Sequence, residues 1–263
     1  MSFVQTRIPI AISRTGLSLM KGGNGKPLLI LHGGGGHPGW MPYHEALAKQ
    51  FTVYAPSHPG FDTSDRPDWL TTVMDIAYFY LSYLDQEDIT DVNLLGFSLG
   101  GWIAAEMVAM CPHIFEKLVL VDAAGIKPEV GEIAETMMIS ADEVQKLMFY
   151  DTDQIIGYQE KVNLALTSEE QMVQWNNREM FSRLGWRPYL HNPKLPSYLG
   201  RVKLPTLIIW GREDAIIPLN SADLYHKMLV NSTLHVIDDC GHLPHIERPD
   251  QFLTTVLRFL STT

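Results

Sequence analysis

The chain has 263 residues, of which 46% are hydrophobic and 19% are charged, a balance that is ordinary for a globular protein with a large buried core. Its formal net charge of −10 at pH 7 disfavours duplex nucleic acid and anionic membranes as partners. The first residues contain no basic segment followed by an apolar one, and no apolar run is long enough to span a bilayer, so we expect a cytoplasmic location. Without an export signal, Cys111 and Cys240 are expected to be free buried thiols.

The first half of the chain alternates apolar runs with segments of helical spacing. Residues 3–12 and 16–20 alternate loosely, which predicts two antiparallel edge strands joined at 14–16. Residues 27–31 are continuously apolar, which is typical of a strand buried on both faces. The elements expected next are a helix at 42–50, a strand at 51–55, a polar loop at 57–65, a helix at 70–87, and strands at 92–95 and 118–121. This alternation predicts an α/β fold with a mostly parallel central sheet flanked by helices.

The alternation breaks between about residues 125 and 200. Helical spacing there predicts helices at 129–139, 141–150, 153–164 and 168–183. A simple crossover needs far fewer residues, so the segment is interpreted as a helical insertion between two strands. A strand at 204–210, a helix at 220–229, a strand at 233–237 and a helix at 249–260 complete the chain. We therefore predict one core domain, formed by residues 1–124 and 201–263, and an inserted helical domain at 125–200.

Residues 96–100 (Gly-Phe-Ser-Leu-Gly) lie between an apolar run and a series of good helix formers. A G-x-S-x-G motif between a strand and a helix is typical of a nucleophile elbow. Side chains two residues before or after such a serine would collide with the neighbouring strand and helix, and Gly96 and Gly100 avoid this. The turn brings the Ser98 hydroxyl to the helix N-terminus, where backbone N–H groups lack partners within the helix. The alternative is a glycine-rich turn in which the serine is incidental.

Other polar groups also follow predicted strands: the loop at 32–36 (His-Gly-Gly-Gly-Gly), Asp214 and His242. In open parallel sheets the chemistry lies beyond the carboxyl ends of the strands. A serine nucleophile needs a base to accept its proton and a third group to orient that base. The order Ser98, Asp214, His242 is the order of serine, acid and histidine in one hydrolase fold. Asp122 also ends a strand and is a rival for the role of the acid.

With these motifs the chain resembles the α/β-hydrolase superfamily over essentially its whole length. The resemblance implies an α/β-hydrolase fold in which the insertion is a cap that covers the pocket. It also implies that Ser98 attacks a carbonyl carbon, that His242 accepts the proton and later protonates the leaving group, and that Asp214 holds the imidazole tautomer.

The resemblance further assigns the oxyanion hole to the backbone N–H groups of Leu99 and Gly34, with Gly35 as the alternative in a run of four glycines. We expect no metal, because His242 and His245 have no third ligand at a suitable spacing. We expect no nucleotide cofactor either, because no Gly-Lys-Ser or Gly-Lys-Thr ending follows the glycines.

An apolar pocket is expected between the cap and the nucleophile, although most apolar residues at helical spacing pack helix against helix. The candidates for its lining are Gly35, Trp40, Trp102, Met138, Trp175 and Trp186. Three cap arginines are candidates for a substrate carboxylate, and structural pairing is the favoured alternative: Arg178, Arg183 and Arg187. His32 is expected to brace its loop by hydrogen bonds. For His37 and His58 a surface position is favoured, and a position that faces the pocket is the alternative.

A serine at the elbow argues against relatives that place an aspartate there, such as haloalkane dehalogenases and epoxide hydrolases. The sequence favours a carboxylic ester hydrolase that acts through an acyl-enzyme on small-molecule substrates with a small to medium, largely apolar acyl group. The first alternative is a carbon–carbon bond hydrolase of the meta-cleavage type, but those relatives usually follow the histidine with tryptophan, where this chain has Leu243. A lactonase, a perhydrolase and a non-enzymatic ligand receptor on the same fold are further alternatives. The chain is expected to be a monomer or a homodimer.

Overall fold

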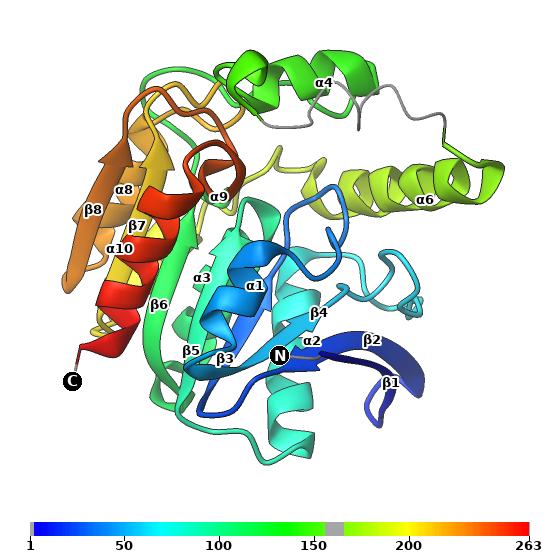
Figure 1. The fold of residues 1–263 in the computed structure, drawn as a ribbon. Coiled ribbons are helices and arrows are strands. Elements are labelled where there is room, and N and C mark those ends of the chain that lie inside the picture. The colour runs from blue at the N-terminus through cyan, green and yellow to red at the C-terminus, as the bar shows by residue number, and fades with distance from the viewer. Residues whose placement is uncertain (1–2, 156–165, 263) are drawn as a thin grey trace.

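The computed structural model describes residues 3–155 and 166–262. Its centre is one eight-stranded sheet with the strand order β1-β2-β4-β3-β5-β6-β7-β8 (Figure 1). The strands are β1 Val4–Ile10, β2 Thr15–Gly22, β3 Lys26–Leu31, β4 Phe51–Pro56, β5 Val92–Phe97, β6 Phe115–Val121, β7 Thr206–Gly211 and β8 Ser232–Ile237. Strand β2 pairs antiparallel with β1 and β4, and the other pairs are parallel. The predicted mostly parallel sheet, with an antiparallel pair at its start, is confirmed.

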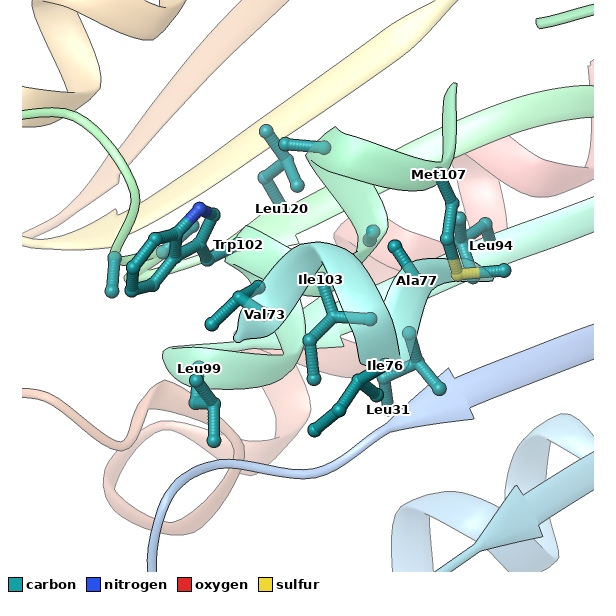
Figure 2. Packing of buried hydrophobic residues seen from close by; sticks show 14 of the residues in the cluster. Leu31, Val73, Ile76, Ala77, Leu94, Leu99, Trp102, Ile103, Met107 and Leu120 are labelled. Carbon is teal, nitrogen blue, oxygen red and sulfur yellow. The ribbon is translucent and has the colours of Figure 1, made fainter. Parts of the chain in front are cut away.

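Helices cover both faces of the sheet, which creates two cores. The helices that cover the two faces are α1 Pro42–Leu47, α2 Val73–Gln86, α3 Leu99–Met110, α8 Asn220–Met228 and α10 Pro249–Ser261. Leu29 and Leu31 of β3 belong to the core beneath α2, α3 and α8, while Leu28 and Ile30 belong to the core beneath α1 and α10. The continuously apolar β3 is therefore buried on both faces, as predicted. Figure 2 shows the first core, where side chains of α2 and α3 pack over the sheet.

The inserted segment contains α4 Ala141–Met148, the short 3-10 helix η2 Thr152–Gln154, α6 Ser168–Gly185 and α7 Leu195–Leu199. Figure 1 shows α4 and α6 beyond the carboxyl ends of the parallel strands. The short α7 packs against α3 and α8, with Leu195 and Leu199 fully buried. The division of the chain into a core domain and a cap remains our proposal. Most of the helix predicted at 153–164 lies outside the described residues.

The helix predicted at 129–139 is wrong, because this segment is irregular. Gly131 has a φ of +84°, which no α-helix accommodates. The backbone N–H groups of the segment find partners elsewhere: Glu129 donates to Asn220 Oδ1 at 2.7 Å, and Ala134 donates to the carbonyl of Ile216 at 2.9 Å. Long-range hydrogen bonds thus replace the helical ones that the apolar spacing suggested.

Three further observations bear on the sequence-based expectations. Cys111 and Cys240 are free thiols, the first half-buried and the second buried. Within the described residues, no helix is long and apolar enough to cross a membrane. A short helix that the sequence analysis did not predict, α9 Pro244–Glu247, follows the loop that carries His242.

Candidate active site

Ser98 occupies a sharp turn between β5 and α3. Its φ of 49° and ψ of −113° are unusual for a non-glycine residue, and its N–H donates to the Val121 carbonyl at 2.9 Å. The flanking glycines are required by close contacts. A Cβ on Gly96 would lie 2.3 Å from the Gly100 carbonyl oxygen, and one on Gly100 would lie 2.2 Å from the Leu31 carbonyl oxygen. The local geometry is that of the strained strand-to-helix turn expected of a nucleophile elbow.

Asp214 and His242 are joined in the interior at the same edge of the sheet. The Nδ1–H of His242 donates to Asp214 Oδ2 at 2.8 Å, and both side chains are buried. The second carboxylate oxygen of Asp214 accepts from the backbone N–H groups of Ile216 at 2.8 Å and Ile217 at 3.0 Å. Because Nδ1 carries the proton, Nε2 of the neutral ring is a proton acceptor. In the described part of the chain, no hydrogen bond joins the Ser98 hydroxyl to this ring.

Asp122, the rival acid, lies beside this pair but does not bond the histidine. Its Oδ1 accepts from the Gly211 N–H at 2.9 Å. Burial, together with the neighbouring carboxylate of Asp214, raises the pKa of Asp122 well above its usual value. Asp122, Asp214 and His242 bring possible metal ligands within 4.8 Å of one another. His242 Nδ1, Asp214 Oδ2 and Asp122 Oδ1 already take part in hydrogen bonds, whereas Asp122 Oδ2 is buried without a hydrogen-bond partner among the described residues.

The residues predicted to form the oxyanion hole are Leu99, which follows Ser98 in the chain, and Gly34, whose neighbour Gly33 lies next to Ser98. Leu99 is the first residue of α3, so its N–H has no acceptor within the helix. On the glycine loop, a Cβ added to Gly33 would lie 3.4 Å from that of Ser98. The next residue, Gly34, lies beneath the ring of Phe181 on α6, where a Cβ would lie 2.5 Å from the ring. The assignment of Leu99 and Gly34 to an oxyanion hole remains a prediction.

Two neighbouring histidines support the start of the glycine loop. The rings of His32 and His58 lie 3.7 Å apart. His32 donates through Nδ1–H to the Gly33 carbonyl at 2.7 Å and accepts at Nε2 from the His58 N–H at 2.9 Å. His58 donates through Nε2–H to the His32 carbonyl and accepts at Nδ1 from the Tyr80 hydroxyl. Both rings are neutral, since burial lowers the pKa of His32 to about 4 and that of His58 well below its usual value.

The bracing role predicted for His32 agrees with these bonds, whereas the surface position expected for His58 is wrong. Its side chain is fully buried beneath His32. The sequence of the polar loop 57–65 gives no indication that its histidine points inward, because the partner Tyr80 lies on a separate helix.

The loop of His242 also contacts the inserted segment. The His242 N–H donates to the Met148 carbonyl at 2.8 Å. Glu247 of α9 accepts from the Gly241 N–H through Oε1 and from the Tyr150 N–H through Oε2, both at 2.8 Å. Burial raises the pKa of the Glu247 carboxyl. The sequence analysis missed Glu247, and nothing in its spacing from the other site residues would have identified it.

The residues predicted to line a pocket have varied surroundings. Trp102 is buried in the core and donates from its indole N–H to Glu106 at 3.0 Å. Trp40 stacks on Phe3 with ring centroids 4.9 Å apart. On the inserted segment, Met138, Trp175 and Trp186 are 70%, 71% and 44% exposed. None of these contacts involves Ser98, so the lining of the pocket stays a prediction.

Two of the three arginines of the inserted segment are structurally paired, as favoured above. Arg178 donates to the carbonyls of Met137, at 3.0 Å, and Ile139. Arg183 donates to the carbonyl of Asp68 at 3.3 Å. These bonds tie α6 to the neighbouring cap segment and to the loop that follows β4.

A model of the alpha/beta hydrolase family matches residues 28–255. The chain belongs to the alpha/beta hydrolase family. Among the curated relatives of this alpha/beta hydrolase, a 2-hydroxymuconate semialdehyde hydrolase from Pseudomonas sp. is 28% identical, over 93% of this chain and 90% of the relative.

Solved structures agree with the fold of this alpha/beta hydrolase. The 2-hydroxy-6-oxo-6-phenylhexa-2,4-dienoate hydrolase of Rhodococcus sp. strain RHA1 superposes with a TM-score of 0.81 at 24% identity, covering 99% of each chain. An esterase from Exiguobacterium antarcticum superposes with a TM-score of 0.73 at 23% identity, covering 98% of this chain and all of the esterase.

Proposed function

We propose that this alpha/beta hydrolase cleaves carboxylic esters with a small to medium, largely apolar acyl group, through an acyl-enzyme on Ser98. The observation that carries the proposal is the buried Asp214–His242 hydrogen bond at the edge of the sheet where the Ser98 turn lies. The bond leaves Nε2 as the proton acceptor, which is the form of imidazole that a serine nucleophile requires.

The proposed reaction has two half-reactions. Ser98 Oγ attacks the ester carbonyl carbon while His242 Nε2 takes the hydroxyl proton and then gives it to the departing alkoxide, which leaves as the alcohol. Water then attacks the acyl-enzyme, His242 takes a proton from it, and that proton returns to Ser98 as the carboxylic acid leaves. The Leu99 and Gly34 N–H groups are proposed to stabilise the oxyanion of each tetrahedral intermediate, a contribution of about 3–4 kcal/mol per donor.

The apolar preference rests on what covers the glycine loop. The Phe181 ring lies against Gly34, so an acyl group bound beside Ser98 would meet an aromatic surface. The guanidinium of Arg178 is engaged by two cap carbonyls, which disfavours it as the partner of a substrate carboxylate.

A second candidate is hydrolysis of a carbon–carbon bond in a dienoate. The curated relatives favour it, since several are named as hydrolases of such compounds, including a 2-hydroxy-6-oxo-2,4-heptadienoate hydrolase from Pseudomonas putida at 27% identity. Leu243 after the histidine speaks against it, by the resemblance argument given above.

One panel of measurements tests both candidates. We expect stoichiometric labelling by a fluorophosphonate, loss of that labelling in Ser98→Ala, and turnover of p-nitrophenyl esters in preference to ring-cleavage dienoates. A folded protein that is labelled but cleaves only the dienoates would replace the first candidate with the second. A folded protein that resists labelling would contradict both.

A further inference from the structure

One buried side chain of the cap reaches the loop that follows β4. Asn177 of α6 is only 4% exposed. Its Oδ1 accepts from the Asp62 N–H at 2.8 Å, and its Nδ2 donates to Asp62 Oδ1 at 2.8 Å. The amide orientation follows from these partners, because the flipped amide would face a donor with a donor and an acceptor with an acceptor.

The same two residues hold the glycine loop. Nδ2 of Asn177 also donates to the Gly35 carbonyl at 3.2 Å, and Asp62 Oδ2 accepts from the His37 N–H at 2.8 Å. Between these contacts, Gly36 has a φ of +100°, and a Cβ there would lie 2.2 Å from Asn177 Nδ2. Asp62 itself has a φ of 49°, uncommon for a residue other than glycine. The segment 35–37 is therefore fixed at both ends by the Asn177–Asp62 pair.

Phe181 lies one turn further along α6 and covers Gly34, so one face of this helix contacts two successive parts of the glycine loop. Gly33, the next residue back, borders Ser98. A shift of α6 would thus be transmitted through segment 35–37 to the N–H of Gly34.

We infer that Asn177 is a positioning residue, which acts through Asp62 and the Gly35 carbonyl to hold the Gly34 N–H in place beside Ser98. Packing of α6 against the glycine loop and placement of the Gly34 N–H for the oxyanion then occur together. The inference rests on the proposed function, because it assigns Gly34 to an oxyanion that forms on Ser98.

The competing explanation is that Asn177 only helps α6 to pack on the rest of the protein. Other contacts of α6 allow this explanation to be tested separately. The titratable groups that face Asp62 are His32 and His37, and burial lowers the pKa of both. The charged groups nearby are Arg66 on the loop after β4, and Arg178 and Glu179 on α6. Arg66 and Glu179 form an exposed ion pair between that loop and α6. Removing this pair weakens docking slightly but leaves the Asn177–Asp62 bonds intact.

The first experiment compares Asn177→Ala with Asn176→Ala, an exposed neighbour on the same helix, and with Glu179→Gln. We expect Asn177→Ala to lower kcat for p-nitrophenyl butyrate by about 10- to 100-fold with little change in KM, since a displaced oxyanion donor acts in the transition state. Affinity for a trifluoromethyl ketone, which forms a tetrahedral oxyanion on the serine, should fall by the same factor. Both controls should keep wild-type values within about twofold.

The second experiment introduces a negative charge at position 177, and it tests the inference even if Asn177→Ala does not fold. Asn177→Asp places a second carboxylate against Asp62, and the repulsion is relieved when one of the two takes up a proton. Activity relative to the wild type should therefore rise as the pH is lowered from 8.5 to 5.5. The double variant Asp62→Asn, Asn177→Asp restores an amide opposite a carboxylate but leaves the Gly35 carbonyl without its donor, so its relative activity should be flat with pH and recover only in part. Asn176→Asp adds the same charge at an exposed site and should show no such trend.

Wild-type kcat and inhibitor affinity in Asn177→Ala would overturn the inference while leaving the ester hydrolase intact. An increase in KM without a loss of kcat would also overturn it, because Asn177 would then act in substrate binding alone. Rates of fluorophosphonate labelling test the positioning role of Asn177 separately from the proposed ester hydrolysis. If the wild-type protein is labelled but cleaves no ester, the proposed function fails, and a slower labelling rate in Asn177→Ala still supports the positioning role.

Discussion

The carboxyl groups of Asp122 and Asp214 lie within 4.8 Å of each other in the protein interior, yet only Asp214 hydrogen-bonds His242. Asp122 instead accepts from the Gly211 N–H, and burial together with the neighbouring Asp214 raises its pKa well above the usual value. Two acids that follow neighbouring strands therefore differ in their hydrogen-bond partners, and we expect them to differ in role.

This difference predicts opposite outcomes for two conservative substitutions. Asp214→Asn should keep the fold but lower kcat for esters by about 10⁴-fold, because the amide no longer selects the correct imidazole tautomer. Asp122→Asn should keep most of the activity, since an amide replaces the protonated carboxyl as a neutral neighbour. Steady-state kinetics on p-nitrophenyl butyrate, with circular dichroism as the folding control, compare the two. The reverse ranking would mean that Asp122 is the acid.

Asp122 also predicts how stability depends on pH. Its pKa is raised in the folded protein, so above about pH 4 the folded state retains a proton that the unfolded chain releases. Stability is then lost as the pH rises from about 4 towards the raised pKa, by at most about 1.4 kcal/mol per pH unit.

The variant Asp122→Asn has no carboxyl group at this position, so it does not bind this proton in either the folded or the unfolded state. Its free energy of unfolding relative to the wild type should increase as the pH rises above about 4, and the gain should level off beyond the raised pKa. Urea unfolding between pH 4 and 9 provides the measurement. Glu106 and Glu247 also have raised pKa values, but both residues are present in the variant and in the wild type. The difference in unfolding free energy between the two proteins therefore reports on Asp122. If the unfolding free energies of the variant and the wild type changed in parallel with pH, the raised pKa of Asp122 would be contradicted.

The close approach of α3 to the sheet predicts intolerance at Gly100. A Cβ there would lie 2.2 Å from the Leu31 carbonyl oxygen and 2.5 Å from that of His32, and neither backbone atom can move freely. Gly100→Ala should cost at least about 3 kcal/mol of unfolding free energy. Gly200→Ala is the matched control, because nothing lies within 4 Å of the new Cβ. It should be neutral or stabilising by up to about 1 kcal/mol.

The contact between Phe181 and Gly34 predicts a change in acyl preference. Phe181→Ala removes the ring from above the glycine loop and should favour longer acyl groups, raising the ratio of kcat/KM for octanoate over acetate p-nitrophenyl esters by about 10-fold or more. Met172→Ala, on the exposed side of α6, is the control and should leave this ratio unchanged. An unaltered ratio in Phe181→Ala would place the acyl group elsewhere.

The sequence predicted those parts of the fold that depend on local pattern. The apolar run of β3 and the G-x-S-x-G turn at Ser98 each carry their cause within a few residues, since one needs two buried faces and the other needs two missing side chains. The Asp214–His242 pair was also predicted, because the carboxyl ends of parallel strands converge at one edge of the sheet.

Features that depend on distant partners were not predicted. Asn177 bonds a residue 115 positions away, and Glu247 bonds one 97 positions away, so neither differs in the sequence from an exposed polar residue. The false helix at 129–139 has the same origin, since the partners of its backbone are Asn220, Ile216 and Tyr189. Local spacing does not reveal which hydrogen bonds the rest of the chain will offer.

The hydrogen bonds of His242 to Met148 and of Glu247 to Tyr150 have a consequence for engineering this enzyme. The groups that the inserted segment supplies to these bonds, the Met148 carbonyl and the Tyr150 N–H, belong to the backbone, so side-chain substitutions that keep the backbone path there keep both bonds, whereas an insertion of different path would lose them. Substrate range is better altered by replacing a single side chain such as Phe181, which takes part in neither bond.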